Sequence, residues 1–232
     1  MSEGPGREKT DEWYDEDYFR TFPVWPRRIR QILRHVDLDA SDRVCEFGCG
    51  LGHILFEVHA RIASGLGIDV SAFAIEQAER RRRALGVDNL EFCKREIRNL
   101  GSDASVAGAF SKVLMMDISE HLYDDTLSAF FRSAHHILEP GGEIVLHTPN
   151  AGYYLERLKA RGWILKQFPS HVAVRGREAY ETALAACGFR TRCVEVLPHY
   201  HIAVGAVDRV GMRLPFVSPL FRSRLLIHAR RP

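Results

Sequence analysis

Short apolar runs alternate with helical patterns over the first 150 residues of the chain. Five of these runs have the length of buried strands: 43–47, 65–70, 90–94, 112–116 and 143–147. Between them apolar residues recur at the three- and four-residue spacing of amphipathic helices, most clearly from Leu127 to Leu138. Strands that alternate with helices in this way predict parallel β-α-β units, with right-handed crossovers and helices on both faces of one sheet.

The alternation loosens beyond the fifth run. A further helix ending at Gly188 precedes two more strand-like runs, 190–197 and 223–229. Two irregular segments, about 149–176 and 198–221, are rich in aromatic residues, proline and glycine. We therefore expect an α/β chain with a doubly wound, mostly parallel seven-stranded sheet. The two irregular segments are expected to be insertions on the substrate side, because specificity usually resides in such loops.

Composition places the chain among ordinary globular proteins. Of its 232 residues, 46% are hydrophobic and 27% are charged, which excludes a disordered chain, a collagen-like repeat and a small disulfide scaffold. No uncharged apolar run approaches the roughly 20 residues of a membrane-spanning helix. The first 20 residues are polar and acidic, unlike a signal peptide. We expect a soluble, cytoplasmic protein without a transmembrane segment.

Charge and cysteine usage point to neither a nucleic acid nor a metal. The net charge of +2 is too small to imply a nucleic-acid partner by itself, and the arginine block 80–83 fits a solvated helix face. The five cysteines include no CxxC pair. Cys45, Cys93 and Cys193 stand inside apolar runs, where we expect buried free thiols. The sequence therefore indicates neither a disulfide framework nor a zinc site.

The segment between the first strand and the first helix carries the most informative motif. It reads CEFGCGLGH over residues 45–53, and its glycines let the backbone turn sharply against a ligand at a helix N-terminus. The spacing is GxGxG and not the GxGxxG of dinucleotide-binding loops, because His53 stands at the third position. Glu46, two residues before the first glycine, would repel a pyrophosphate but suits a ligand that carries an ammonium group.

Asp69 lies at the end of the second strand, 17 residues after Gly52. A carboxylate there can accept both hydroxyls of a ribose, as the ribose-binding acid of nucleotide folds does. An acid at this point could instead cap the following helix, but Ser71 is better placed for that role. Because Asp69 stands at this distance from the glycine loop, it strengthens the interpretation of that loop as a ligand site.

On these motifs the chain resembles the class I S-adenosylmethionine-dependent methyltransferases. Segments resembling four of their motifs follow in order at 46–52, 67–71, 117–122 and 138–142. The pair Glu120-His121 and the turn Pro140-Gly-Gly are closest to the small-molecule branch that includes the ubiquinone-biosynthesis O-methyltransferases. The resemblance implies a Rossmann-like methyltransferase fold, with an N-terminal lid and helix in residues 1–40 and the methyltransferase domain in residues 41–232.

The resemblance also implies that the cofactor is S-adenosylmethionine and that the product formed from it is S-adenosylhomocysteine. The implied cofactor-binding residues are Tyr18, Glu46, Gly48, Cys49, Gly50, Gly52, Asp69, Val70, Glu96, Ile97 and Asp117. The glycines would pass under the methionine part, and Glu46 would hold its ammonium end directly or through water. Asp69 would bind the ribose hydroxyls, with Val70 against the adenine. Glu96 stands where this family often has an aspartate, and Asp117 would lie near the methionyl group.

An acceptor hydroxyl would gain from a general base. Asp117 and His121 are four residues apart and would share one face if their segment began a helix. His121 is the first candidate base, because histidine titrates near working pH; a structural role at the helix start is the alternative. His171, in the first irregular segment, competes with it. Imidazoles and carboxylates could also hold a divalent ion, but no HxxxH or HExxH spacing supports this, so we expect no metal.

The N-terminal block 13–19 is dense in aromatic residues. A tyrosine such as Tyr18 can present its ring to a sulfonium, or the block can simply anchor a helix on the core. In residues 149–176 aromatic and basic side chains interleave, which suits an aromatic or anionic acceptor, a nucleic acid or a membrane surface.

We predict methyl transfer to an oxygen or nitrogen of a small molecule. An RNA or protein methyltransferase is the first alternative, although no NPPY-type tetrapeptide of base-methylating enzymes follows the fourth strand. A non-catalytic cofactor-binding protein of the same fold is the second. The acceptor, the methylated atom and the choice between monomer and homodimer stay open.

Overall fold

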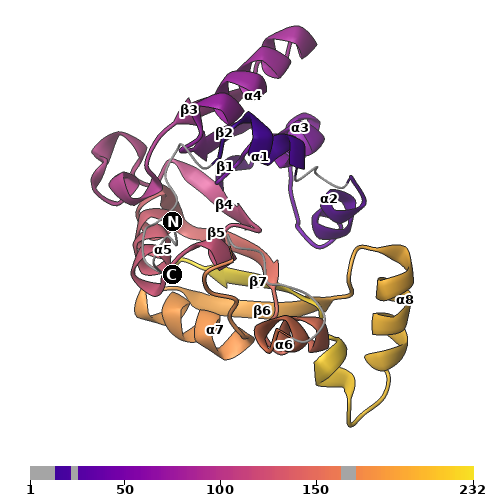
Figure 1. Ribbon diagram of the computed structural model, residues 1–232. Helices are drawn as coiled ribbons and strands as arrows, with labels where there is room; N and C mark the ends of the chain where they lie inside the picture. The colour runs from indigo at the N-terminus through magenta and orange to yellow at the C-terminus, as the bar shows by residue number, and fades with distance from the viewer. Residues whose placement is uncertain (1–13, 22–25, 163–170) are drawn as a thin grey trace, which may run out of the picture.

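The computed structural model describes residues 14–21, 26–162 and 171–232, and within them seven strands form one sheet (Figure 1). The strands are β1 (Arg43–Phe47), β2 (Ser64–Asp69), β3 (Leu90–Lys94), β4 (Phe110–Met116), β5 (Leu138–Pro149), β6 (Arg190–Leu197) and β7 (Arg224–Arg230). Their order across the sheet is β3-β2-β1-β4-β5-β7-β6. Pairs among the first five strands are parallel, and β7 runs antiparallel between β5 and β6. The expected doubly wound, mostly parallel seven-stranded sheet is confirmed.

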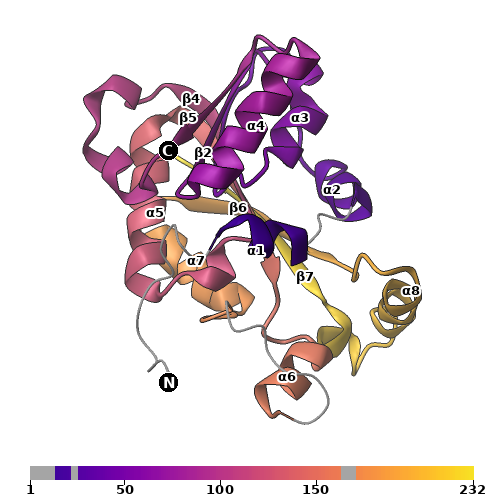
Figure 2. The ribbon, with the colours of Figure 1, turned by 45° about the horizontal axis from the view of Figure 1, so that its top comes forward.

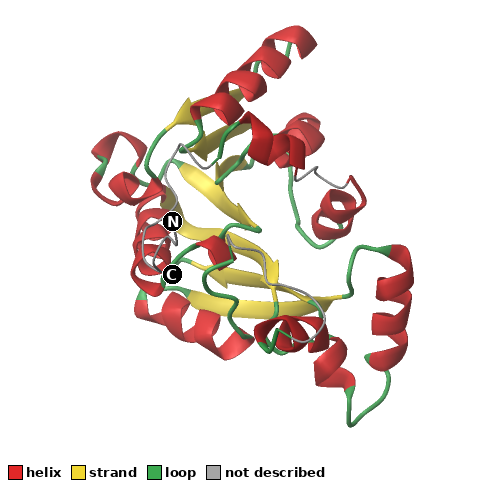
Figure 3. Ribbon diagram, viewed as in Figure 1, coloured by secondary structure: helices red, strands yellow, loops and turns green. Residues whose placement is uncertain are grey.

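Helices cover both faces of this sheet (Figures 2 and 3). They are α1 (Glu16–Thr21), α2 (Pro26–Leu33), α3 (His53–Val58), α4 (Ala72–Leu85), α5 (Asp124–Ile137), α6 (Tyr154–Ala160), α7 (Arg177–Ala186) and α8 (Ile202–Gly211). Buried side chains of α5 and α7 form one core with the strands. Those of α2, α3 and α4 form a second core on the opposite face. The two cores are what the alternating sequence pattern requires, since a buried parallel strand presents apolar side chains to both sides.

Local sequence determines where the longer helices begin and end. The hydroxyl of Ser71 accepts a hydrogen bond from the backbone N–H of Ala74 and so caps α4, as expected. The helix ends at Gly86, whose φ of 64° is a left-handed conformation that glycine adopts without strain. The predicted stripe in α5 is buried along its whole length.

The structure corrects two expectations for the sheet. The Pro140-Gly-Gly turn lies inside β5, which begins at Leu138 and shifts register opposite Phe110 and Lys112. Cys193 is exposed and not buried, because it lies on the edge strand β6. Cys45 is buried as expected, and Cys93 is partly buried.

The two irregular segments both contain helices. Residues 149–176 include α6, and residues 198–221 include α8 and the 3₁₀ helix Ser218–Phe221. The helices α6 and α8 lie toward one end of the sheet, below and to the right in Figure 1. Among the described residues, no helix has the length and apolar character needed to cross a bilayer. The cytoplasmic location stays a prediction.

Candidate functional site

The glycine loop lies where β1 ends, beside the change in strand order between β1 and β4. The backbone N–H groups of Gly48 and Cys49 both donate to the carbonyl of Ile68, which ties the loop to β2. Gly48 has a φ of 68°, and a Cβ built on it would come within 2.2 Å of the Ile118 side chain. A side chain at this position would therefore be both strained and blocked. In open α/β sheets ligands bind at such a switch point, outside the carboxyl ends of the strands.

Two cavities, of about 490 and 620 Å³, meet at this loop. The smaller one is lined by side chains that follow β2, β3 and β4, among them Asp69, Val70, Glu96 and Ile97. The larger one extends from Glu46 toward the late segments of the chain. Six residues line both: Tyr18, Phe19, Gly48, Gly50, Asp117 and His121. The cavities are therefore neighbouring compartments that share one wall.

Glu46 contributes a buried carboxylate to the larger cavity. Its side chain is 3% exposed, and its Oε2 atom has no hydrogen-bond partner within the described structure. Burial raises the pKa of this carboxyl well above its usual value, and the backbone N–H of Leu55 opposes that shift. A cationic ligand would therefore meet a carboxyl that has little water to compete with it.

Asp69 connects the end of β2 to the glycine loop. Its Oδ2 accepts the N–H of Gly50 at 2.8 Å, and its Oδ1 accepts the N–H of Ser71 at 2.9 Å. These bonds fix the orientation of the carboxylate at the end of β2. Asp69 thus shapes the loop and faces the smaller cavity.

Asp117 lies among three cationic or imidazole side chains at the junction of the cavities. Its carboxylate is 3.2 Å from Arg28 Nε, 3.0 Å from His147 Nδ1 and 3.4 Å from Arg224 Nη1. Burial by itself raises the pKa of Asp117, but the charges of Arg28, His147 and Arg224 outweigh it and hold the pKa well below its usual value. Asp117 is therefore an ionised anchor, and its very weak basicity does not suit it to be the general base.

His121 and His171 lie together although 50 positions separate them in the sequence. Their ring centroids are 5.0 Å apart in an edge-to-face arrangement, and both line the larger cavity. Burial, followed by the neighbouring His121, lowers the pKa of His171 to about 4. His171 is therefore neutral at physiological pH. Glu120 is adjacent, and the ligand atoms of these three side chains all lie within 4.8 Å of one another, so they could also hold a divalent ion.

Arg175 explains why the two histidines meet. It is buried, and its guanidinium donates to the backbone carbonyls of Ser119 and Leu122 and to the carboxylate of Asp124. The N–H of Ala173 donates to the carbonyl of Glu120. These bonds attach the segment that carries His171 directly to the turn that carries His121.

One expectation about the site needs correction. Asp117 and His121 do not share a helix face, because Asp117 has a φ of 54° and the short 3₁₀ helix Ser119–His121 starts after it. They meet because both line the same cavities. A Cβ built on Gly52 would come within 2.5 Å of Phe92, so close packing behind the loop also requires a glycine there. The expected contact of Gly52 with the cofactor stays a prediction.

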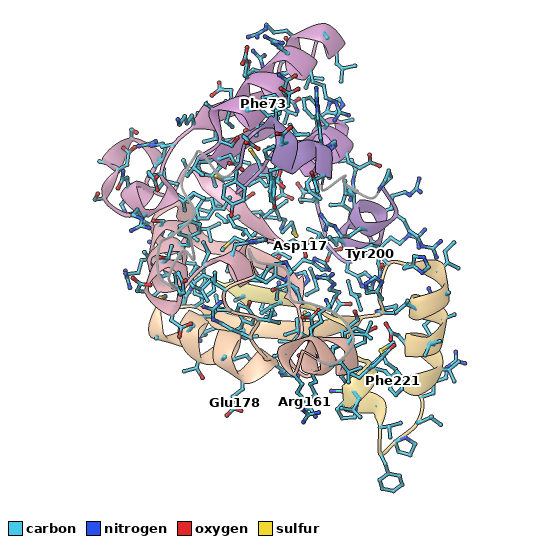
Figure 4. The ribbon with its side chains drawn as sticks, viewed as in Figure 1. Phe73, Asp117, Arg161, Glu178, Tyr200 and Phe221 are labelled. Carbon is cyan, nitrogen blue, oxygen red and sulfur yellow. The ribbon has the colours of Figure 1, made fainter. Side chains whose placement is uncertain are left out.

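Sequence reasoning missed the basic and aromatic wall of the larger cavity. Arg28 lies on α2, Arg224 begins β7, and their guanidinium carbons are 6.0 and 5.7 Å from the ring centroid of Tyr200. Figure 4 shows Asp117 and Tyr200 in the middle of the molecule, between α2 and the sheet. Because β7 is antiparallel, its first residue lies beside the carboxyl ends of β4 and β5. The sequence alone does not reveal that β7 is antiparallel, and without that knowledge Arg224 could not be assigned to the site.

Comparison with known proteins agrees with this geometry. A family model described as a methyltransferase domain matches residues 38–192. The chain belongs to this methyltransferase family. The expected likeness to S-adenosylmethionine-dependent methyltransferases is thereby confirmed.

Curated relatives include ubiquinone biosynthesis O-methyltransferases. The protein from Methylococcus capsulatus is 30% identical over 162 residues, which cover 68% of this chain and 65% of the relative. The protein from Pseudomonas aeruginosa is 28% identical over 164 residues, covering 68% of this chain and 67% of the relative. The match therefore spans about two thirds of the length of these relatives.

Solved structures share the fold at lower identity. Geranyl diphosphate C-methyltransferase from Streptomyces coelicolor, solved with Mg²⁺, geranyl diphosphate and S-adenosylhomocysteine, aligns with a TM-score of 0.65 at 18% identity, covering 88% of this chain and 78% of that one. The [4+2]-cyclase SpnF aligns with the same TM-score and identity, covering 89% and 80%. At these identities the likeness concerns the fold alone.

The residues of the two cavities fit S-adenosylmethionine. Glu46 presents a buried carboxyl oxygen that lacks a partner, which suits an ammonium group. The loop at Gly48 is closed to side chains, and Asp69 lines the smaller cavity with a carboxylate, a group that suits a diol.

Glu120 makes stability depend on pH. Burial, followed by the charge of Asp117, raises the pKa of Glu120 to about 8. The folded protein therefore binds a proton that the unfolded chain releases near pH 4.5, and stability falls as pH rises from about 4.5 to about 8. We expect Glu120→Gln to remove this decline and to stabilise the protein at pH 8 by on the order of 2 kcal/mol.

Urea unfolding at pH 5 and pH 8 measures the effect. Glu178→Gln is the matched control, because Glu178 is exposed on α7 and points away from the molecule in Figure 4. A Glu120→Gln variant whose stability changes between the two pH values as much as the wild type does would contradict the assignment.

Proposed function

We propose that the chain transfers a methyl group from S-adenosylmethionine to an oxygen or nitrogen of a small molecule bound in the larger cavity. The observation that carries this proposal is the wall shared by the two cavities. Asp117 and His121 line both compartments, so a cofactor that extends from the smaller cavity to Glu46 and an acceptor in the rest of the larger cavity would meet beside them. Alignment of the reactants with exclusion of water is the main task of such a site.

Five positions would hold the cofactor through distinct contacts. Glu46 would bind its ammonium group, and the loop at Gly48 would lie against its methionine part. Asp69 would accept the ribose hydroxyls, while Val70 and Ile97 would pack around the adenine in the smaller cavity. Bound in this way, S-adenosylmethionine supplies a methyl group already activated by its positive sulfur.

The first helix would act as a lid. Phe19 packs against Phe73 of α4, with ring centroids 6.1 Å apart, and its ring lies 3.3 Å from a Cβ built on Gly50. The hydroxyl of Ser71 donates to the backbone carbonyl of Tyr14. Tyr18 lines both cavities and is the aromatic residue proposed to face the sulfonium. We accordingly keep residues 1–40 as the lid region and residues 41–232 as the methyltransferase domain.

The larger cavity suits an anionic or aromatic acceptor of small-molecule size. A volume of about 620 Å³ is in the usual range of small-molecule sites. Arg28 and Arg224 supply positive charge, and Tyr200 supplies a ring for stacking. The relatives are named as O-methyltransferases, which supports transfer to oxygen, so a phenol is the first acceptor class to test.

His121 is the proposed general base. It lines both cavities, whereas His171 lines only the larger one and has a pKa of about 4, too low for an efficient base at neutral pH. His171 would instead accept a hydrogen bond and orient either His121 or the acceptor. The proton of an acceptor hydroxyl would pass to His121 as the methyl group is transferred.

Calorimetric titration with two ligands tests the cofactor roles. S-adenosylhomocysteine carries the ammonium group, and 5′-methylthioadenosine carries the adenosine without it. We expect Asp69→Ala to weaken both by roughly 10- to 100-fold, because charge-assisted hydrogen bonds to the ribose are lost. Glu46→Gln should weaken S-adenosylhomocysteine alone.

Asp88→Ala is the control, because Asp88 is exposed before β3 and away from both cavities. Unchanged affinity in Asp69→Ala would contradict the ribose assignment. Equal losses for the two ligands in Glu46→Gln would contradict the ammonium assignment.

Methyl transfer to 3,4-dihydroxybenzoate, an anionic phenol, tests the acceptor and the base. We expect incorporation of labelled methyl into this probe and none into tRNA. His121→Gln should lower kcat by roughly 10²- to 10⁴-fold, the usual contribution of a general base, with unchanged affinity for S-adenosylhomocysteine. His59→Gln, outside both cavities, is the matched control.

Adding a chelator to this assay distinguishes catalysis by a general base from catalysis that needs a metal ion. Activity that survives chelation and falls only in His121→Gln supports the base. Loss on chelation with recovery on added Mg²⁺ would contradict it and assign Glu120, His121 and His171 to an ion. Transfer to tRNA in place of the phenol would favour the RNA alternative.

A further inference from the structure

A second group of ligand-type side chains lies on the β6-β7 edge of the sheet, away from the two cavities. Cys193 and Glu195 alternate along β6 and so face the same side, and Cys193 is the cross-strand partner of His228 on β7. Arg224 marks the cavity end of β7. His228 is four residues further along, about 13 Å at the rise of an extended strand.

The donor atoms of this group are already close together. Cys193 Sγ, a carboxylate oxygen of Glu195 and a ring nitrogen of His228 all lie within 4.8 Å of one another, and His228 Nε2 is 3.8 Å from Glu195 Oε1. Ligands of a tetrahedral zinc ion stand about 2.0 to 2.3 Å from the metal, so that neighbouring ligands are about 3.3 to 3.8 Å apart. Small side-chain rotations would bring the three donors to that spacing.

The surroundings of the His228 imidazole are those of a metal ligand. Its side chain is 9% exposed, and Nε2 has no hydrogen-bond partner within the described structure. Its other ring nitrogen, Nδ1, lies 3.6 Å from a carboxylate oxygen of Glu143. A carboxylate behind one ring nitrogen, with the other nitrogen directed at the ion, is the usual support of a metal-bound histidine.

The carboxylate of Glu195 is supported in the same way. Its Oε2 is 2.6 Å from Nδ1 of His35, which leaves Oε1 directed toward His228. Ligating carboxylates are themselves commonly hydrogen-bonded. Two of the three donors thus have an orienting partner behind them, which an arbitrary group of surface residues would not provide.

We propose that Cys193, Glu195 and His228 form a binding site for a zinc ion. Thiolate, imidazole and carboxylate together suit zinc better than magnesium or calcium, which take oxygen ligands. The fourth position would be left to water, because Cys193 is exposed. Metal binding would displace the thiol proton, so affinity should rise with pH.

The site would connect α2 to the edge of the sheet. His35 lies two residues after the end of α2, and α2 also carries Arg28, which pairs with Asp117 at the junction of the cavities. An ion that fixes Glu195 would therefore fix the end of the helix that forms one wall of the acceptor cavity. Binding to the folded state alone would also stabilise the protein.

Cobalt titration of the metal-free full-length protein tests the site. Bound Co²⁺ gives a thiolate-to-metal charge-transfer band in the near ultraviolet only where a cysteine ligates it. The group Glu120-His121-His171 has no thiol and cannot give this band. We expect the band to saturate at one equivalent of Co²⁺ and to disappear when Zn²⁺ is added.

Three variants decide the assignment. Cys193→Ser should abolish the band, and His228→Gln should weaken Co²⁺ binding at least tenfold. Cys187→Ser is the control, because it changes a partly exposed thiol outside the group, and it should keep both the band and the affinity. Thermal unfolding with Zn²⁺ should show a higher Tm for wild type and Cys187→Ser than for Cys193→Ser. Absence of the band in the wild type, or a band that persists in Cys193→Ser, would overturn the proposal.

Discussion

The arrangement of the site depends on one buried carboxylate. Asp117 follows β4 in a left-handed conformation and pairs with Arg28 of α2, His147 of β5 and Arg224 of β7. A buried charge without partners costs several kcal/mol, so each of these elements must be in place for the carboxylate to be satisfied. The same pairing holds α2 against the sheet and gives the larger cavity its basic wall. Packing of the two cores then fixes the rest of the fold around this junction.

Local sequence was sufficient to predict the glycine loop and the position of Asp69, which we propose hold the cofactor. The glycine loop and Asp69 are specified by residues close to one another in the chain, and each lies at the end of a strand whose apolar pattern is plain. Sequence spacing does not show on which side of the loop a residue lies, so the close approach of Gly52 to Phe92 could not be predicted.

The acceptor half depends on contacts that no local pattern specifies. His171 reaches His121 because Arg175 ties two distant segments together. Arg224 reaches Asp117 because β7 is inserted antiparallel, and a strand's direction in the sheet is decided by tertiary packing. Cys193 was expected to be buried for a similar reason, since an apolar run does not show that its strand forms the edge of the sheet.

A fold of this kind supports more than one chemistry, as the likeness to a [4+2]-cyclase illustrates, so function must be argued from the junction itself. A double-mutant cycle in the free energy of unfolding tests that junction most directly. Asp117→Asn removes the charge and keeps a residue that tolerates the left-handed conformation, and Arg28→Gln removes one partner. The account predicts that Asp117→Asn costs about 3 to 5 kcal/mol and that the two changes are coupled by at least about 1 kcal/mol. A coupling energy near zero would contradict it.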